Sequence, residues 1–210
     1  IKEEDDIEFI KIATKTSNKN NLYDTIFERG VPALVLFTSG SSGEPKGALH
    51  DFSKLLNKFK VKRNALLTIN FLLFDHWGGL NTLFHVLSNG GTLVFLKNRN
   101  PDYVCQQIEK HKVELLPTSP TFLNMLMISR AYERSSLDSL KLISYGAEPM
   151  PESLLKHLNK IFPNIKLQQT YGLIELGVMR SQSQDNGSLW VKIGGEGYQT
   201  RVEDGILQIK

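Results

Sequence analysis

The chain alternates short apolar runs with longer amphipathic stretches, and this alternation predicts strands separated by helices. Segments predicted as strands, most of them apolar, lie at residues 33–37, 65–74, 92–96, 113–116, 140–144 and 165–169. Between them, apolar residues spaced for one helix face lie at residues 52–59, 80–87, 101–111, 120–126 and 151–161. Strands joined by helices are typical of parallel pairing, so we predict an α/β fold, a mostly parallel sheet flanked by helices.

The expected helix boundaries carry signals of their own. Asn100-Pro101 and Ser119-Pro120 each combine a capping side chain with a proline suited to the first helical position. The pair Gly78 and Gly79 predicts a turn ahead of the helix at residues 80–87. The Asn-Gly-Gly sequence at residues 89–91 is typical of the end of that helix.

The two ends of the chain differ from this central pattern. Residues 1–30 predict a lead-in segment with an edge strand at 7–13 and a short helix at 22–28. At the other end, residues 188–193, 198–202 and 206–210 predict consecutive strands without helices, and Glu203-Asp204-Gly205 predicts a hairpin turn. We therefore expect an incomplete α/β subdomain over residues 1–180 and the start of a small β-rich subdomain over residues 181–210.

Composition narrows the class of protein. The 25 Lys and Arg residues against 22 Asp and Glu give a net charge of only +3, and the basic residues are scattered, so we expect no nucleic-acid partner. The single cysteine, Cys105, excludes an internal disulfide and a multi-cysteine zinc site. No apolar run approaches the roughly 20 residues of a membrane span. These features favour a cytoplasmic protein, and they leave its oligomeric state open.

The strongest local signal is the run Thr38-Ser39-Gly40-Ser41-Ser42-Gly43-Glu44-Pro45-Lys46-Gly47, which directly follows an expected strand. Glycines let backbone amides approach a phosphate, the hydroxyls can donate to its oxygens, and Lys46 adds a positive charge. The run is not a Walker A loop, because Pro45 precedes Lys46 and Gly47 follows it. By composition alone, a flexible surface loop is the alternative.

This run resembles the phosphate-binding loop of the adenylate-forming enzymes: acyl- and aryl-CoA synthetases, luciferases and nonribosomal adenylation domains. Three further segments resemble that family in its order along the chain. They are Phe74-Asp75-His76-Trp77-Gly78-Gly79, Tyr145-Gly146-Ala147-Glu148-Pro149-Met150-Pro151 and Gln169-Thr170-Tyr171-Gly172-Leu173-Ile174-Glu175. The resemblance covers residues from about 30 to 210 and implies a central fragment of the family's large N-terminal domain.

The resemblance implies adenylation of a carboxylic acid, which attacks the α-phosphorus of ATP to give an acyl-AMP and pyrophosphate. A thiol, of CoA or of the phosphopantetheine of an acyl carrier protein, then takes the acyl group. The implied catalytic residues are Lys46, Glu175 and His76, with Glu175 as the Mg²⁺ ligand and His76 and Trp77 beside the carboxylate pocket. The implied nucleotide-binding residues are Thr38, Ser39, Gly40, Ser41, Ser42, Gly43, Lys46, Gly146, Ala147, Glu148, Tyr171 and Gly172. His85 and Cys105 match no motif, and we interpret both as structural.

The chain departs from the family pattern in two respects. Ile174 stands where the family has Thr or Ser, and an isoleucine cannot donate a hydrogen bond to the α-phosphate, so we expect weakened adenylation unless Thr170 substitutes. The chain also lacks the family's upstream subdomain, ribose-binding aspartate, hinge and C-terminal domain with its catalytic lysine, so we expect this fragment alone to be inactive. The alternative is a non-catalytic nucleotide-binding or scaffold relative with a decayed site. Asp75 suits an amino acid and His76 an acyl or aryl acid, so the acid stays open.

Overall fold

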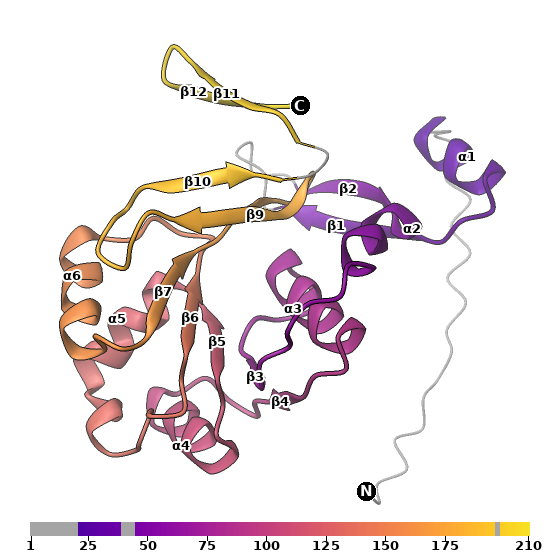
Figure 1. The fold of residues 1–210 in the computed structure, drawn as a ribbon. Helices are drawn as coiled ribbons and strands as arrows, with labels where there is room; N and C mark the ends of the chain where they lie inside the picture. Colours follow the sequence, from indigo (N-terminus) through magenta and orange to yellow (C-terminus); the bar gives the residue numbers. More distant parts are fainter. Residues whose placement is uncertain (1–20, 39–44, 196–197) are drawn as a thin grey trace, which may run out of the picture.

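A five-stranded parallel sheet forms the centre of the computed structural model, which describes residues 21–38, 45–195 and 198–210 (Figure 1). The strand order is β4-β3-β5-β6-β7, and the pairs of neighbours are parallel. The strands are β3 (Thr68–Asn70), β4 (Leu93–Phe95), β5 (Leu115–Thr118), β6 (Leu142–Tyr145) and β7 (Lys166–Gln169). The predicted parallel sheet is therefore confirmed.

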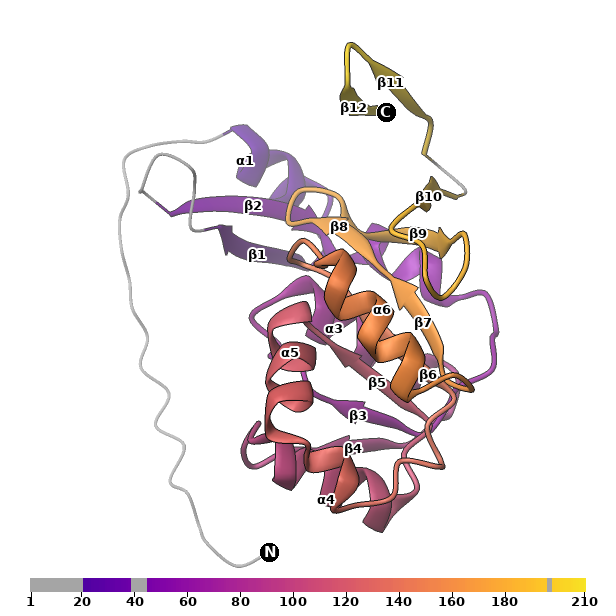
Figure 2. The ribbon, with the colours of Figure 1, turned by 90° about the vertical axis from the view of Figure 1, so that its left-hand side faces the viewer.

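Helices lie on both faces of this sheet. Figure 2 shows α5 and α6 in front of the sheet and α3 behind it. The predicted caps are present, because Asn100 Oδ1 accepts from the Asp102 N–H and Ser119 Oγ accepts from the Phe122 N–H. The helices that connect the parallel strands are α3 (Trp77–Ser88), α4 (Pro101–His111), α5 (Pro120–Ser129) and α6 (Glu152–Ile161), and a 3₁₀ turn η2 (Ala131–Glu133) follows α5.

The hydrophobic core lies between the sheet and helices α4, α5 and α6. One apolar row crosses the sheet, since Leu116 neighbours Ile143 and Ile143 neighbours Leu167 in the strand register. Helix residues close over this row and are equally buried. The side chains at or below 1% exposure include Ile69, Val104, Ile108, Leu116, Leu123, Leu126, Ile143, Leu155, Leu158 and Leu167.

Antiparallel strand pairs precede and follow the parallel sheet in the sequence, and two short helices accompany the first pair. Near the N-terminus, α1 (Asn21–Glu28) precedes a hairpin of β1 (Ala33–Thr38) and β2 (Lys46–Asp51), followed by α2 (Phe52–Leu55) and a 3₁₀ turn η1 (Leu56–Phe59). Near the C-terminus, a sheet in the order β10-β9-β8 contains β8 (Tyr171–Leu173), β9 (Gly177–Ser183) and β10 (Val191–Gly194). A separate hairpin joins β11 (Thr200–Glu203) and β12 (Ile206–Ile209). The expected β-rich C-terminal end is confirmed.

Several local expectations need correction. The antiparallel strands of the C-terminal end begin at Tyr171, earlier than residue 181, because β8 pairs antiparallel with β9. Lys46 and Gly47 belong to β2 rather than to a loop, since they pair with Thr38 and Phe37.

The strand expected at residues 65–74 is shorter, and Gly78 and Gly79 lie inside the first turn of α3. Gly79 is a glycine because the helix approaches the preceding loop closely there, and a Cβ at this position would collide with the Leu73 carbonyl oxygen. The strand expected at residues 7–13 lies outside the described residues.

Side chains from β9 and the loop after it complete the outer edge of β7. Asn186 accepts from the Leu167 N–H at 2.9 Å and donates to the Ile165 carbonyl at 2.8 Å. Ser183 Oγ accepts from the Gln169 N–H, and Ser181 Oγ donates to the Gln169 carbonyl. The edge of the sheet is therefore closed by side-chain amide and hydroxyl groups just before the chain reaches Tyr171.

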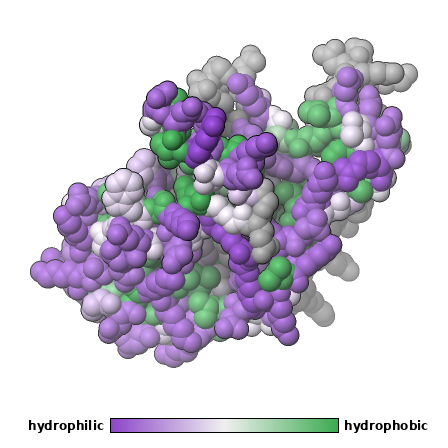
Figure 3. Space-filling model, turned by 45° about the horizontal axis from the view of Figure 1, so that its top comes forward, coloured by the Kyte–Doolittle hydropathy of each residue, from purple (hydrophilic) through white to green (hydrophobic). Residues whose placement is uncertain are grey.

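The surface seen in Figure 3 is mostly hydrophilic, with hydrophobic side chains in small groups between polar ones. Within the described ranges, no helix combines the length and the apolar character needed to cross a bilayer.

Candidate functional site

The segments singled out by sequence follow the carboxyl ends of the parallel strands. Residues 71–77 follow β3, Ser119 follows β5, Gly146 follows β6 and Thr170 follows β7. The carboxyl ends of parallel strands meet at one edge of a sheet, where α/β proteins bind their ligands. Three of the four family-like segments therefore emerge at a common edge.

The β1–β2 hairpin carries the fourth segment. Thr38 pairs with Lys46 at the end of the hairpin, and Lys46 is exposed. The predicted phosphate-binding residues Ser39, Gly40, Ser41, Ser42 and Gly43 lie outside the described residues, and Thr38 is described here by its backbone. The structure thus gives the position of Lys46 beside the expected loop and leaves the roles of the other residues as predictions.

Gly146 and Thr170 bring two of the predicted adenine-binding segments together. The Thr170 N–H donates to the Tyr145 carbonyl at 2.7 Å, and the Thr170 hydroxyl donates to the same oxygen at 3.1 Å. A Cβ on Gly146 would lie 2.7 Å from the Thr170 carbonyl oxygen and even closer to its hydroxyl. Glycine is therefore required sterically at position 146, and the segment that begins there lies against the segment that leads into Tyr171.

Ala147 and Glu148 continue this junction. Ala147 has a φ of 68°, in the left-handed region that alanine rarely adopts, and such backbone strain is concentrated at functional sites. Glu148 Oε2 accepts from the Thr121 N–H at 3.0 Å and from the Thr121 hydroxyl at 2.6 Å. The Glu148 carboxylate thus caps the start of α5, where the helix dipole favours a negative charge, and this contact ties the 146–148 segment to α5.

Tyr171 and Gly172 lie on β8, directly beyond the junction. Tyr171 is half-buried and is paired with Met179 of β9. A Cβ on Gly172 would lie 2.9 Å from the Gly177 carbonyl oxygen, so glycine at this position allows β8 and β9 to approach closely. Tyr171 therefore lies on a strand that is held in two ways, by pairing with β9 and by its direct connection to Thr170 at the end of β7.

Ile174 and Glu175 lie in the turn between β8 and β9. The Ile174 carbonyl accepts two hydrogen bonds, from Trp77 Nε1 at 2.6 Å and from His50 Nε2 at 2.8 Å. Glu175 is exposed, and its carboxylate has no hydrogen bond or ion pair to the other described residues. An unpaired carboxylate fits a Mg²⁺ ion that takes its remaining ligands from water and phosphate oxygens. Across the described ranges, no group of three or more His, Cys, Asp or Glu side chains forms a closed metal site.

His76 and Trp77, predicted together, have different surroundings. His76 precedes the first residue of α3, its side chain is 66% exposed, and its Nε2 lies 3.7 Å from Asp75 Oδ1. Trp77 is buried at 7% exposure, with its indole N–H bonded to the Ile174 carbonyl. His76 is therefore accessible to a ligand, whereas the polar group of Trp77 already has a protein partner.

Cys105 and His85, which match no family motif, lie on helices away from the candidate site. Cys105 is 1% exposed on the inward side of α4, as expected, and burial raises the pKa of its thiol to about 12. His85 is half-buried on α3, and burial together with the Arg63 charge lowers its pKa. Neither side chain lies in the segments that form the candidate site.

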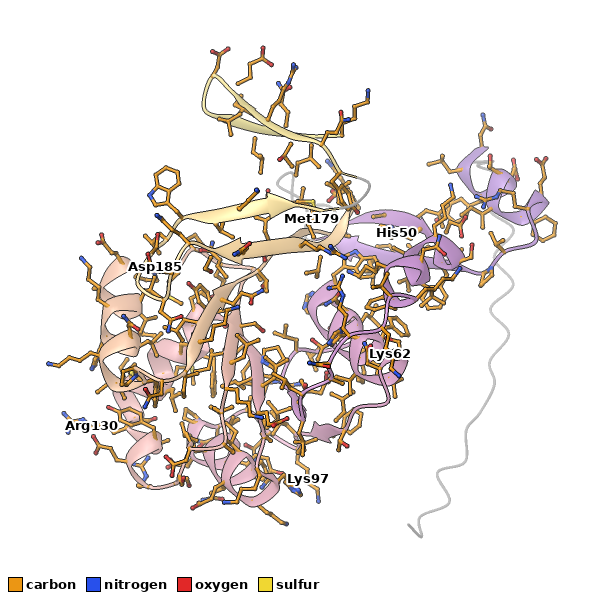
Figure 4. All side chains as sticks on the ribbon, in the orientation of Figure 1. His50, Lys62, Lys97, Arg130, Met179 and Asp185 are labelled. Atoms are coloured by element: carbon orange, nitrogen blue, oxygen red, sulfur yellow. The ribbon has the colours of Figure 1, made fainter. Side chains whose placement is uncertain are left out.

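His50 is the residue that the sequence did not single out. It lies on β2, four residues after Lys46, and is buried at 9% exposure. Figure 4 labels it near Met179, where the β1–β2 hairpin meets β9. A histidine in a short strand gives no signal by itself, because its partner is the backbone carbonyl of a residue 124 positions later.

The sequence profile of AMP-binding enzymes matches residues 3–198. Among curated relatives, 4-coumarate–CoA ligase-like 9 from Arabidopsis thaliana is 26% identical over 181 residues, which covers 81% of this chain and 32% of that protein. D-alanine–D-alanyl carrier protein ligase from Bacillus licheniformis is 27% identical over 154 residues, covering 69% of this chain and 30% of that protein. The chain thus spans about a third of the length of the curated relatives it matches.

Solved structures give a similar result. A luciferase-like enzyme from the nonluminescent mealworm Zophobas morio matches with a TM-score of 0.61 and 26% identity. The match covers 69% of this chain and 35% of that chain.

Proposed function

The chain belongs to the AMP-binding enzyme family, and from that premise we propose that the protein containing it is an AMP-forming acid–thiol ligase. In this reaction the carboxylate oxygen of the acid attacks the α-phosphorus of ATP. The bond to pyrophosphate breaks, and the acyl-AMP then gives its acyl group to a thiol. Both relatives named above are described as ligases, one a CoA ligase-like protein and one a carrier protein ligase.

The contact between Gly146 and Thr170 is the observation that carries this proposal. It forces the backbone that follows β6 against the backbone that leads into Tyr171. In this proposal the adenine ring binds in a slot between the aromatic face of Tyr171 and this closely approaching main chain. We assign Gly146, Ala147, Tyr171 and Gly172 to this slot. Glu148 supports it by holding the segment on α5.

The remaining predicted residues are assigned by charge and accessibility. Attack of a carboxylate on a phosphate brings two anions together, so the site needs positive charge and fixed alignment. Lys46 supplies an exposed ammonium beside the predicted phosphate loop, and the free Glu175 carboxylate would hold Mg²⁺. A bound Mg²⁺ would neutralise phosphate charge. His76, exposed at the start of α3, would border the acid.

The acceptor thiol is CoA or a carrier-protein phosphopantetheine. The named relatives include both kinds of ligase, and the chain covers about a third of each. We therefore propose the shared first step, adenylation of a carboxylic acid, as the activity to which the described residues contribute.

ATP–pyrophosphate exchange by the full-length protein tests the proposal. The assay contains Mg²⁺ and a panel of fatty, aryl and amino acids, and circular dichroism establishes that the protein is folded. We expect exchange that depends on one acid class and is lost in Lys46→Ala. Folded protein that catalyses no exchange with any acid class would overturn the proposal.

A non-catalytic relative is the second candidate, and Ile174 is the observation that favours it. The Ile174→Thr variant separates the two. If Ile174 merely slows the reaction, restoring the hydroxyl should raise the exchange rate by about 30–1,000-fold, since one hydrogen bond to developing charge contributes about 2–4 kcal/mol. A folded wild type and a folded variant that are both inactive would favour the non-catalytic relative.

A further inference from the structure

Three segments that are distant in the sequence meet at one backbone oxygen, the carbonyl of Ile174. His50 comes from β2, the strand that Lys46 begins, and its Nε2 lies 2.8 Å from this oxygen. Trp77 is the first residue of α3, directly after His76, and its Nε1 lies 2.6 Å away. Both side chains are buried, with 9% and 7% of their surface exposed.

The chemistry of this contact assigns the proton on His50. A carbonyl oxygen only accepts hydrogen bonds, so His50 carries a proton on Nε2 and donates to the oxygen, as the indole N–H of Trp77 does. The two rings also support each other, because their centroids are 5.1 Å apart in an edge-to-face arrangement with an interplanar angle of 82°. Each ring therefore limits the movement of the other around the shared acceptor.

The far side of the turn is held in the same way. The Tyr198 hydroxyl donates to the Leu176 carbonyl at 3.0 Å, and Lys58 Nζ donates to the Val178 carbonyl at 2.9 Å. Gly177 has a φ of 77°, and a Cβ at that position would lie 3.7 Å from the Trp77 ring. The carbonyls on both sides of Glu175 are thus fixed by side chains from outside the β8–β9 hairpin.

Glu175 is different from its neighbours, because its carboxylate is exposed and has no partner among the described side chains. A fixed backbone beneath an unpaired side chain is an arrangement that presents the side chain to a ligand. The second donor supports this view, since one N–H already satisfies a turn carbonyl and two add positional restraint.

We infer that His50 and Trp77 are positioning residues for the adenylation step, acting through the Ile174 carbonyl on the turn that presents Glu175. The inference rests on the proposed function for its kinetic consequence, whereas its structural consequence is independent of activity. Tyr171 is held separately by β9 and Thr170. Loss of either donor should therefore lower the rate of the chemical step and leave ATP affinity almost unchanged.

The test uses four variants of the full-length protein. His50→Phe and Trp77→Phe each remove a donor and keep an aromatic ring. His50→Gln keeps an amide N–H near the position of Nε2, so it should keep both kcat and the hydrogen exchange of the turn near wild type. His111→Phe is the matched control, because His111 is exposed at the end of α4. Two measurements are made on each: kcat and KM for ATP in pyrophosphate exchange, and amide hydrogen exchange of peptides that cover residues 171–178 and 120–129.

We expect His50→Phe and Trp77→Phe to lower kcat at least tenfold with less than a threefold change in KM for ATP. Amide exchange should accelerate over residues 171–178 and remain unchanged over residues 120–129 in α5. His50→Gln and His111→Phe should stay near wild type in both measurements. If the wild type catalyses no exchange, the proposed function fails and the kinetic part of the inference fails with it, while hydrogen exchange still tests whether His50 and Trp77 hold the turn. An unchanged kcat in an active protein, unchanged protection of residues 171–178, equal acceleration in α5, or no rescue by His50→Gln would each overturn the inference.

Discussion

The Gly146→Ala variant tests the contact on which the proposed adenine slot depends. Gly146 is buried and its φ is not positive, so alanine is disfavoured there by space alone. The added Cβ would lie 2.7 Å from the Thr170 carbonyl oxygen and closer still to its hydroxyl, and both atoms belong to a segment bonded to Tyr145. The substitution must therefore displace Thr170 or the chain that follows β6.

The free energy of unfolding should fall by about 2–3 kcal/mol. Overpacking of a rigid site costs about 1–3 kcal/mol. Weakening the hydrogen bond from Thr170 to Tyr145 adds about 1 kcal/mol. The lower entropy of alanine in the unfolded chain offsets about 0.4–1 kcal/mol of this. The displaced Thr170 would also move Tyr171, so the affinity for ATP should fall by at least about tenfold, the equivalent of about 1.4 kcal/mol.

Urea unfolding and equilibrium binding of a fluorescent ATP analogue measure the two effects. Gly187→Ala is the matched control, because the nearest atom to its new Cβ is Asp185 Oδ1 at an ordinary 3.5 Å. That variant should stay within about 0.5 kcal/mol of wild type. If Gly146→Ala were as stable as Gly187→Ala and bound the analogue as tightly as wild type, the contact would not form the slot.

Three further predictions address the β7 edge, the buried thiol and one lysine. Asn186→Ala removes the two hydrogen bonds with Leu167 and Ile165 at the β7 edge, a loss of about 2 kcal/mol. Hydrogen exchange of the Leu167 amide should therefore become roughly 30-fold faster. The control Asn164→Ala, at an exposed site, should leave this exchange rate unchanged. Cys105 should react with an aromatic disulfide reagent at least about a hundredfold more slowly in the native protein than in denaturant, because burial raises its pKa to about 12. Lys58 is exposed, but partial desolvation of its ammonium and the Arg63 charge lower its pKa from 10.5 to about 8. The unfolded state therefore binds more protons between these pH values, so the urea midpoint should rise from pH 8 to 10.5 more in wild type than in Lys58→Met.

The helices and the parallel strands could be predicted because their signals are local. Capping at Asn100 and Ser119 needs only residues within the next three positions. Strands β4 (Leu93–Phe95) and β6 (Leu142–Tyr145) lie in apolar runs, whereas β7 (Lys166–Gln169) is mostly polar and was indicated by its place after a helix. Helices of ordinary length between these strands then indicated the parallel pairing.

The strands β2, β8 and β9 could not be predicted in the same way. Lys46–Asp51 and Gly177–Ser183 contain glycine and polar residues, and neither shows the alternation of a half-buried strand. Their conformation depends on pairing with β1 and β8, so it is determined by tertiary contacts rather than by local propensity. The candidate site could be predicted from family motifs. His50 could not, since its partner is a backbone atom 124 residues later in the chain.

The position of Ile174 separates two effects that a substitution in a motif usually combines. Its side chain lacks the hydroxyl of the family pattern, and we expect the cost of that loss to fall on the proposed phosphate contact. Its carbonyl, in contrast, is present in every residue type, and this oxygen is the acceptor for His50 and Trp77. The anchoring of the turn is therefore independent of the residue at position 174, and Tyr171 and Glu175 keep their placement. For the proposed ligase, this separation predicts that Ile174→Thr raises kcat without changing the hydrogen exchange of residues 171–178.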